Sequence, residues 1–135
     1  MSRYDTWPAL LTTFIEERRA MAFAWGKNDC ATFAADWVLK ATGCDLAASF
    51  RGRYSTPLGA MRMLKPFGGV VGIAESDARL FEVNKAKAGR GDIVARMTER
   101  GPALGICLGS VAAFVGPVGL IFVSTFDQTL RCWTF

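Results

Sequence analysis

A chain of 135 residues is long enough to bury one hydrophobic core, so we predict a single domain over residues 1–135. Hydrophobic residues make up 51% of the chain and charged residues 21%, which excludes a disordered or low-complexity protein. The net charge of +4 is modest and the basic residues are scattered, so we expect no nucleic-acid partner.

The first part of the chain has the hydrophobic period of helices. Apolar residues recur at helical spacing over residues 7–19, which predicts a first amphipathic helix. A second helix begins at Asn28 or Asp29, both good N-caps, and ends at Gly43. We expect Cys30 to lie in the first turn of this helix, on its inner face.

Further helices are predicted after a loop. The sequence Ser55-Thr56-Pro57 caps a third helix, which Pro66 stops. Its inner apolar residues are expected to be Leu58, Met61 and Leu64. Residues 70–83 are expected to form a short helix and then an edge strand.

From Gly89 onward the period changes to that of strands. Five short apolar segments are separated by glycine and proline, at residues 89–97, 103–109, 110–116, 119–124 and 130–135. Helices followed by strands predict the α+β class. We therefore expect N-terminal helices packed on a C-terminal antiparallel sheet of about five strands.

Residues 101–126 carry no charge and are numerous enough to cross a membrane as a helix. Gly105 and Gly109 also form the small-residue spacing of packed membrane helices. However, Pro117 and several glycines divide this stretch into pieces of strand length. Buried strands are therefore the favoured interpretation, and we expect no membrane span.

The four cysteines lie at positions 30, 44, 107 and 132, and the chain has no histidine. No pair has the spacing of a structural zinc site, so we expect no metal and no cofactor. An iron–sulfur cluster on four thiolates is a minor alternative, against which the wide spacing argues. The N-terminal residues lack a secretory signal, so the thiols are expected to be reduced when the chain is made.

The stretch WGKNDCATFAADWV, residues 25–38, admits two interpretations of Cys30. A thiol at a helix N-terminus meets the positive end of the helix dipole and unpaired amides, which favour the thiolate of a nucleophile. The same position suits a small buried residue on the inner face of the helix. Local sequence alone leaves both open.

Three short motifs occur in the order found in a known family. An aromatic residue and a glycine precede Asp29-Cys30, the pair Gly91-Asp92 leads into the first strand, and the next strand reads ALGICLG from Ala103. In this order of elements, from about Phe23 to Phe135, the chain resembles the NlpC-like branch of papain-fold cysteine peptidases. It more closely resembles the small NlpC-related proteins encoded among bacteriophage tail genes. The resemblance implies a papain-like, NlpC-type fold.

In active members of this family the first helix cysteine is the nucleophile, and a histidine begins the second sheet strand. The resemblance therefore places Cys30 at the nucleophile position and Ala103 at the position of the missing histidine. Amide hydrolysis by a thiol needs a base for the thiol and an acid for the leaving amine, and the loss of such a group lowers the rate about 100- to 10,000-fold. We expect Cys30 to be a vestigial nucleophile and the protein not to be an enzyme.

The resemblance implies a non-catalytic structural component of a bacteriophage tail tip, associated with the baseplate or hub and with tail assembly. It implies other tail-tip proteins, such as the hub and the distal tail protein, as partners. It also implies a location in the virion tail after synthesis in the host cytoplasm. The alternative is an active cysteine peptidase or amidase that degrades peptidoglycan peptides during genome delivery, with Cys30 as nucleophile and a base from a partner subunit.

Other residues give weaker indications. Arg51, Arg53 and Tyr54 are of the types enriched at interface anchors, so we expect a partner contact there, the alternative being an ordinary basic loop. Three aspartates are expected to cap helices, to face solvent or to form a turn before a strand: Asp29, Asp36 and Asp92.

Overall fold

The computed structural model describes all residues, 1–135, and has an α+β architecture. The N-terminal half forms four helices, α1 (Trp7–Arg18), α2 (Cys30–Thr42), α3 (Pro57–Leu64) and α4 (Val70–Ser76). The strands are β1 (Phe81–Val83), β2 (Ile93–Thr98), β3 (Gly101–Cys107), β4 (Val111–Gly116), β5 (Gly119–Ser124) and β6 (Arg131–Thr134). Short helical turns complete the chain at η1 (Lys65–Phe67), η2 (Lys85–Lys87) and α5 (Thr125–Gln128).

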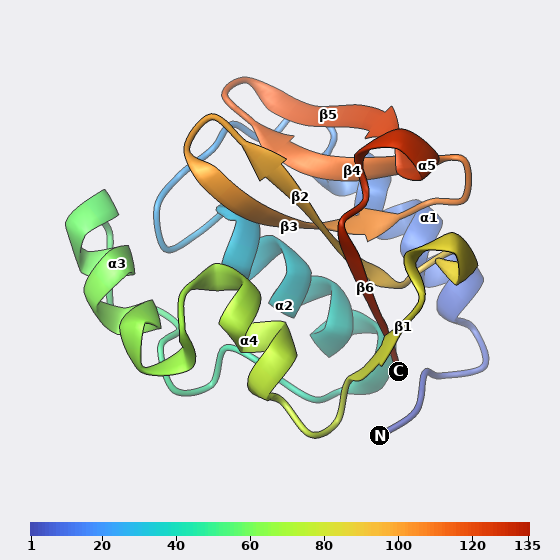
Figure 1. Cartoon of the computed structure of the whole chain (residues 1–135), viewed down its shortest axis with the longest axis horizontal. Helices are drawn as coiled ribbons and strands as arrows, with labels where there is room; N and C mark the ends of the chain where they lie inside the picture. The colour runs from blue at the N-terminus through green and yellow to red at the C-terminus, as the bar shows by residue number, and fades with distance from the viewer.

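The strands form one six-stranded sheet in the order β1-β6-β2-β3-β4-β5, and every neighbouring pair is antiparallel. Figure 1 shows this sheet above the helices α2 and α4. The expected arrangement of N-terminal helices on an antiparallel sheet is confirmed. The sheet has six strands rather than about five because β1 joins it at one edge, and the short helix and edge strand expected over residues 70–83 are α4 and β1.

The uncharged residues 101–126 form β3, β4 and β5, as the strand interpretation predicts. Pro117 lies in the turn between β4 and β5, where a missing N–H does not break the ladder. None of the helices of this chain combines the length and the apolar character that crossing a membrane requires.

Helix α2 runs through the centre of the molecule. Asp29 is its N-cap and Gly43, in the left-handed conformation at φ 81°, is its C-cap, so both predicted ends are correct. Eight of its thirteen residues are buried, which is the pattern of a helix covered on more than one side. The Trp37 indole N–H donates a 2.8 Å hydrogen bond to the carbonyl of Gly91, which ties the helix to the start of β2.

The prediction of which residues of α3 face the core is correct for Leu64 and wrong for Leu58 and Met61. Leu58 and Met61 are 50% and 64% exposed, whereas Ala60 and Leu64 are buried. The inner face is set by Gly59, where a Cβ would come within 3.1 Å of the Tyr54 side chain. Small residues allow this close approach, and the larger Leu58 and Met61 therefore turn outward.

Candidate functional site

The start of α2 is built by a reciprocal cap around Cys30. The Asp29 carboxylate accepts a 2.8 Å hydrogen bond from the backbone N–H of Thr32, and the Asp29 N–H donates to the Thr32 hydroxyl at 2.9 Å. Two otherwise unpaired N–H groups are satisfied in this way, which fixes where the helix begins. Cys30 is consequently the first residue of the helix, at the position that the sequence predicts.

The Asp29 carboxylate is buried and has further partners. Its second oxygen accepts hydrogen bonds from the Gly26 N–H at 2.9 Å and from the Tyr54 hydroxyl at 2.6 Å. Gly26 has φ 79° and lies against the carbonyl of Tyr54, so only glycine fits this turn. The carboxylate therefore serves as a structural cap, which confirms the capping role expected of Asp29.

Tyr54 lies near Cys30, which was not predicted from the sequence. Burial and the neighbouring Asp29 raise the pKa of the Tyr54 phenol above its usual range, so the hydroxyl stays protonated and donates to the carboxylate. The two residues are 25 positions apart, so no local sequence pattern reveals this pair.

The thiol of Cys30 is disfavoured as a thiolate. Burial raises the pKa of Cys30 to about 11, and the negative charge of Asp29 acts in the same direction. The backbone amides of Leu104, Cys30 and Ala31 lower this pKa, but by less than burial raises it. With a pKa of about 11, roughly one thiol in ten thousand is ionised at pH 7.

Strand β3 runs beside this site, but it does not direct the other predicted position, Ala103, toward Cys30. The amide of the next residue, Leu104, lies beside the sulfur of Cys30, and the Leu104 side chain is part of the main core. Ala103 itself packs against a smaller cluster on the other face of the sheet, made of Val94, Cys107, Ala112, Phe114 and Cys132. A methyl group can neither take nor return a proton, so β3 supplies no acid–base group to the thiol.

The three residues of the loop that were predicted to contact a partner, Arg51, Arg53 and Tyr54, differ in their surroundings. Tyr54 is buried, and Arg51 pairs with Asp45 at 2.9 Å and with Asp36 at 2.6 Å. Arg53 is exposed and forms no ion pair within the chain. A partner contact by this loop stays a prediction, for which Arg53 is the most accessible of the three residues.

Asp36 is not a solvated or capping residue, so that expectation was wrong. Its carboxylate lies between Arg51 and Arg18, and it is ion-paired with both. Arg18 also donates a 2.9 Å hydrogen bond to the side chain of Asn28. The hydrogen bond that Arg51 donates to Asp45 holds the pKa of Asp45 below its usual value. These pairs join the end of α1, the middle of α2 and the loop after α2.

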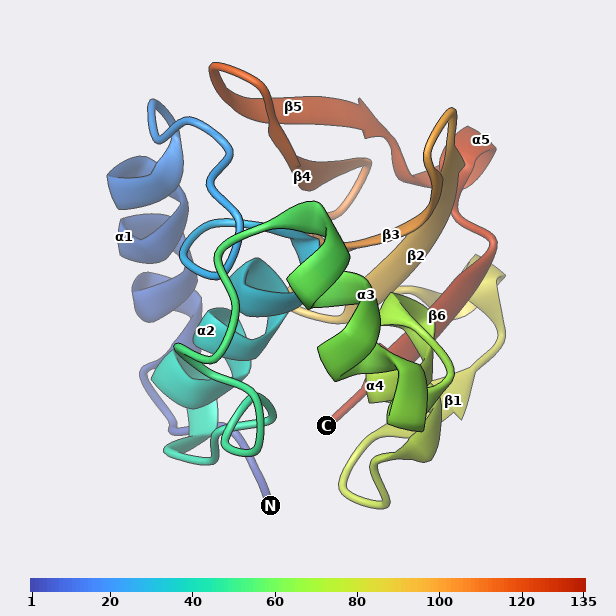
Figure 2. The same ribbon diagram turned by 90° about the vertical axis from the view of Figure 1, so that its left-hand side faces the viewer.

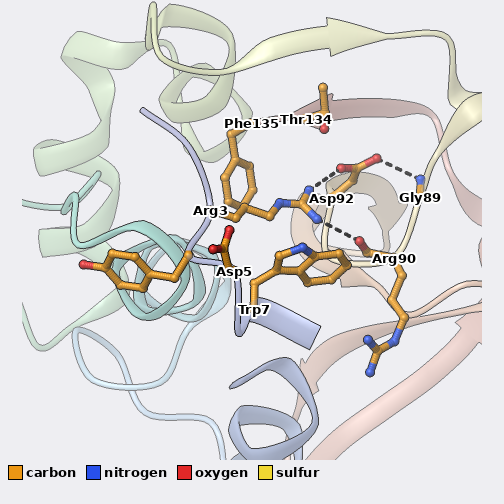
Figure 3. A pocket seen from close by; sticks show the side chains of 9 residues that line it. Arg3, Asp5, Trp7, Gly89, Arg90, Asp92, Thr134 and Phe135 are labelled. Atoms are coloured by element: carbon orange, nitrogen blue, oxygen red, sulfur yellow. Dashed lines mark hydrogen bonds and ion pairs between the residues drawn. The ribbon is translucent and has the colours of Figure 1, made fainter. Parts of the chain in front are cut away.

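A pocket of about 560 Å³ does not include Cys30 among its lining residues. Figure 3 shows the side chains that line it. Its polar centre is Arg3, whose guanidinium stacks on Trp7 and Phe135, with 4.6 Å and 4.5 Å to the ring centres. Arg3 also forms a 2.6 Å ion pair with Asp92 and donates to the Arg90 carbonyl at 2.9 Å.

Asp92 has the turn role expected before β2. Its carboxylate accepts a 2.8 Å hydrogen bond from the Gly89 N–H, in addition to the ion pair with Arg3. The Tyr4 N–H donates to the Ala41 carbonyl, so this pocket borders the C-terminal end of α2. At 1.5 Å per helical residue, Ala41 is about 16 Å along the helix from Cys30. Neither this pocket nor the smaller one beside Asp36 includes Cys30.

The four cysteines are distributed over distant parts of the fold. Cys30 and Cys44 lie at opposite ends of α2, about 20 Å apart for a helix of thirteen residues. Cys107 and Cys132 are buried in the smaller cluster. The geometry therefore contradicts an iron–sulfur cluster held by all four thiolates. No group of three or more His, Cys, Asp or Glu residues is placed to hold a metal ion.

Comparison with known proteins identifies the family of the chain. No curated protein matches the chain. A family model described as a domain of unknown function (DUF6950) matches residues 2–135, which is nearly the whole chain. The match therefore covers the cap at Asp29, Cys30, the Arg3 pocket and the entire sheet. The chain belongs to this DUF6950 family.

Proposed function

We propose that this protein is a non-catalytic structural component of a bacteriophage tail tip, built on a degenerate NlpC-like, papain-type fold. The observation that carries the non-catalytic part is the isolation of the Cys30 thiol. Its pKa is raised to about 11, the chain has no histidine, and Ala103, to which the resemblance assigns the histidine position, faces the other side of the sheet. The phage part is supported by the order of the Asp-Cys helix, the Gly-Asp strand and the ALGICLG strand.

The neighbours of Cys30 do not replace the missing imidazole. The carboxylate of Asp29 is occupied by Gly26, Thr32 and Tyr54, and its charge opposes ionisation of the thiol. The Tyr54 hydroxyl already donates to Asp29. A thiol attack therefore has no group to accept the thiol proton and deliver it to a leaving amine, and both transfers are required for amide hydrolysis.

Cell-wall hydrolysis tests the non-catalytic proposal. Purified protein and the Cys30→Ala variant are incubated with peptidoglycan, and released peptides are measured by mass spectrometry. We expect no release above the background of buffer alone by either protein. The same assay with purified tails added detects a base that a partner subunit supplies. Release that disappears in Cys30→Ala, in either format, favours the alternative of an active cysteine peptidase.

Location tests the tail-tip proposal independently of catalysis. We expect the chain in purified virions by mass spectrometry, and at the tail tip by labelling with a specific antibody. Co-purification with the hub and distal tail proteins is the expected pattern of partners. A stable monomer in the host cytoplasm that is absent from virions contradicts the proposal.

A further inference from the structure

The outer surface of α3 carries two exposed apolar side chains and two cations on one stripe. Leu58, Met61, Arg62 and Lys65 are three, four and seven positions apart, which places them on the same side of a helix. All four are exposed, and the backbone at Lys65 keeps helical geometry, with its N–H bonded to the Met61 carbonyl. We call these four residues the α3 face.

The α3 face is accessible from outside the fold. In Figure 1 α3 projects at the left-hand edge of the molecule, and in Figure 2 the same helix lies toward the viewer. Isolated exposed apolar residues are common on protein surfaces and need no explanation. Here, however, Leu58 and Met61 lie one turn apart and border cations, a combination of apolar centre and charged rim that is typical of interfaces.

The charged residues along the chain on either side of the α3 face are of one sign. Residues 46–74 contain no Asp or Glu, and of their four basic residues only Arg51 is paired with carboxylates of this chain. Arg53, Arg62 and Lys65 have no ion-pair partner. Arg62 and Lys65 lie near the C-terminal end of α3, where cations are favourable, but this does not account for the exposure of Leu58 and Met61.

We infer that the α3 face docks a protein partner whose contact surface is apolar at its centre and bordered by carboxylates. Leu58 and Met61 supply apolar area, and the flexible Met61 adapts to the shape of the partner. The cations speed association and fix its orientation by attraction to carboxylates at the rim. This inference rests on the proposed function, because it names the surface by which the protein joins the tail.

Binding to purified phage tails that were assembled without this chain tests the inference. Labelled protein is sedimented with these tails at low and at high salt. We expect Leu58→Ser/Met61→Ser to bind roughly tenfold more weakly or worse, the usual effect of truncating anchor residues. We expect Arg62→Glu/Lys65→Glu to bind more weakly at low salt and to lose most of the salt dependence.

Two variants elsewhere on the surface serve as matched controls. Phe126→Ser removes an 86% exposed apolar side chain on α5, on the opposite side of the molecule in Figure 1. Lys85→Glu/Lys87→Glu reverses two exposed charges on η2. Both are expected to bind as the wild type does. Thermal unfolding of all variants verifies that the exposed substitutions leave the fold intact.

The outcomes separate the inference from the proposed function. If wild-type protein does not bind tails at all, the proposed function is overturned, and the docking inference with it. If the wild type binds and the α3 variants bind equally well, only the inference is overturned. Flotation with phosphatidylglycerol vesicles and light scattering of the protein alone test two other occupants. Vesicle binding or dimer formation that Leu58→Ser/Met61→Ser abolishes overturns the inference in favour of a membrane or of a second copy.

Discussion

The reactivity of Cys30 toward iodoacetamide is the most direct consequence of its surroundings. Only the thiolate reacts, so the rate follows the ionised fraction. A cysteine at its ordinary pKa of about 9 is roughly 9% ionised at pH 8. With a pKa of about 11, Cys30 is roughly 0.1% ionised at this pH. Folding therefore slows alkylation of Cys30 by roughly 100-fold at pH 8, before any steric protection is added.

The rate is measured on native protein between pH 7 and 11, and the peptide that carries Cys30 is quantified by mass spectrometry. We expect the rate to rise roughly tenfold per pH unit without reaching a plateau below about pH 10. The same peptide from urea-unfolded protein gives the reference rate. Cys44, at the other end of α2 and partly exposed like Cys30, gives an internal comparison within one sample.

A plateau below pH 8 is the result that would refute this reasoning. It would mean that the helix N-terminus and the Leu104 amide stabilise the thiolate more than burial and Asp29 destabilise it. Cys30 would then have the protonation state of an active nucleophile, and peptidase assays with partner subunits would become the priority.

Three further predictions concern stability. Tyr54→Phe removes a hydrogen bond to the buried Asp29 carboxylate, and we expect urea denaturation to show a loss of about 1.5–3 kcal/mol. Arg3→Ala leaves the Asp92 carboxylate without a cation. Because the Arg3 and Asp92 side chains are only 11% and 8% exposed, the expected loss in the free energy of unfolding is about 3–5 kcal/mol. Burial raises the pKa of Cys132 to about 12, so the unfolded chain loses this proton first, and this thiol by itself lowers stability by about 1.4 kcal/mol for each pH unit from about 9 to 12. Cys30 adds a fall of the same sign from about pH 9 to 11.

Two of these predictions have a control variant. Arg19→Ala breaks the exposed pair with Glu16 and should cost less than about 1 kcal/mol, so an equal effect of Arg3→Ala would contradict a buried ion pair. For the alkaline series, Cys132→Ala should have a shallower pH dependence than the wild type. An unchanged slope would assign the effect to other groups. Unaltered stability of Tyr54→Phe would mean that Asp29 is satisfied without the phenol.

Local rules were sufficient for much of the fold. The ends of α2 follow from a capping aspartate and a left-handed glycine, Asp29 and Gly43, which act within four residues of the helix. The strands after Gly89 follow from short apolar segments divided by turn residues. These signals depend on neighbours in the sequence, and for that reason they are readable without a structure.

Long-range contacts were not predictable in the same way. The pairs Arg3–Asp92 and Tyr54–Asp29 join residues 89 and 25 positions apart, and no spacing rule links them. Helix α3 is short, and its apolar residues allow either side to face inward. The side that faces inward is set by the close approach of Gly59 to Tyr54 in the preceding loop, a contact that the sequence did not indicate.

The two edges of the sheet affect whether the protein aggregates at high local concentration. An uncovered edge strand offers free N–H and C=O groups to a strand of another molecule, which leads to aggregation. Here β1 is only three residues long and carries Glu82, which pairs with Arg131. At the opposite edge, the Leu120 N–H of β5 already donates to the Arg19 carbonyl. Strand-to-strand association is thus discouraged at both ends, so crowded copies remain separate and contacts through side-chain surfaces are favoured.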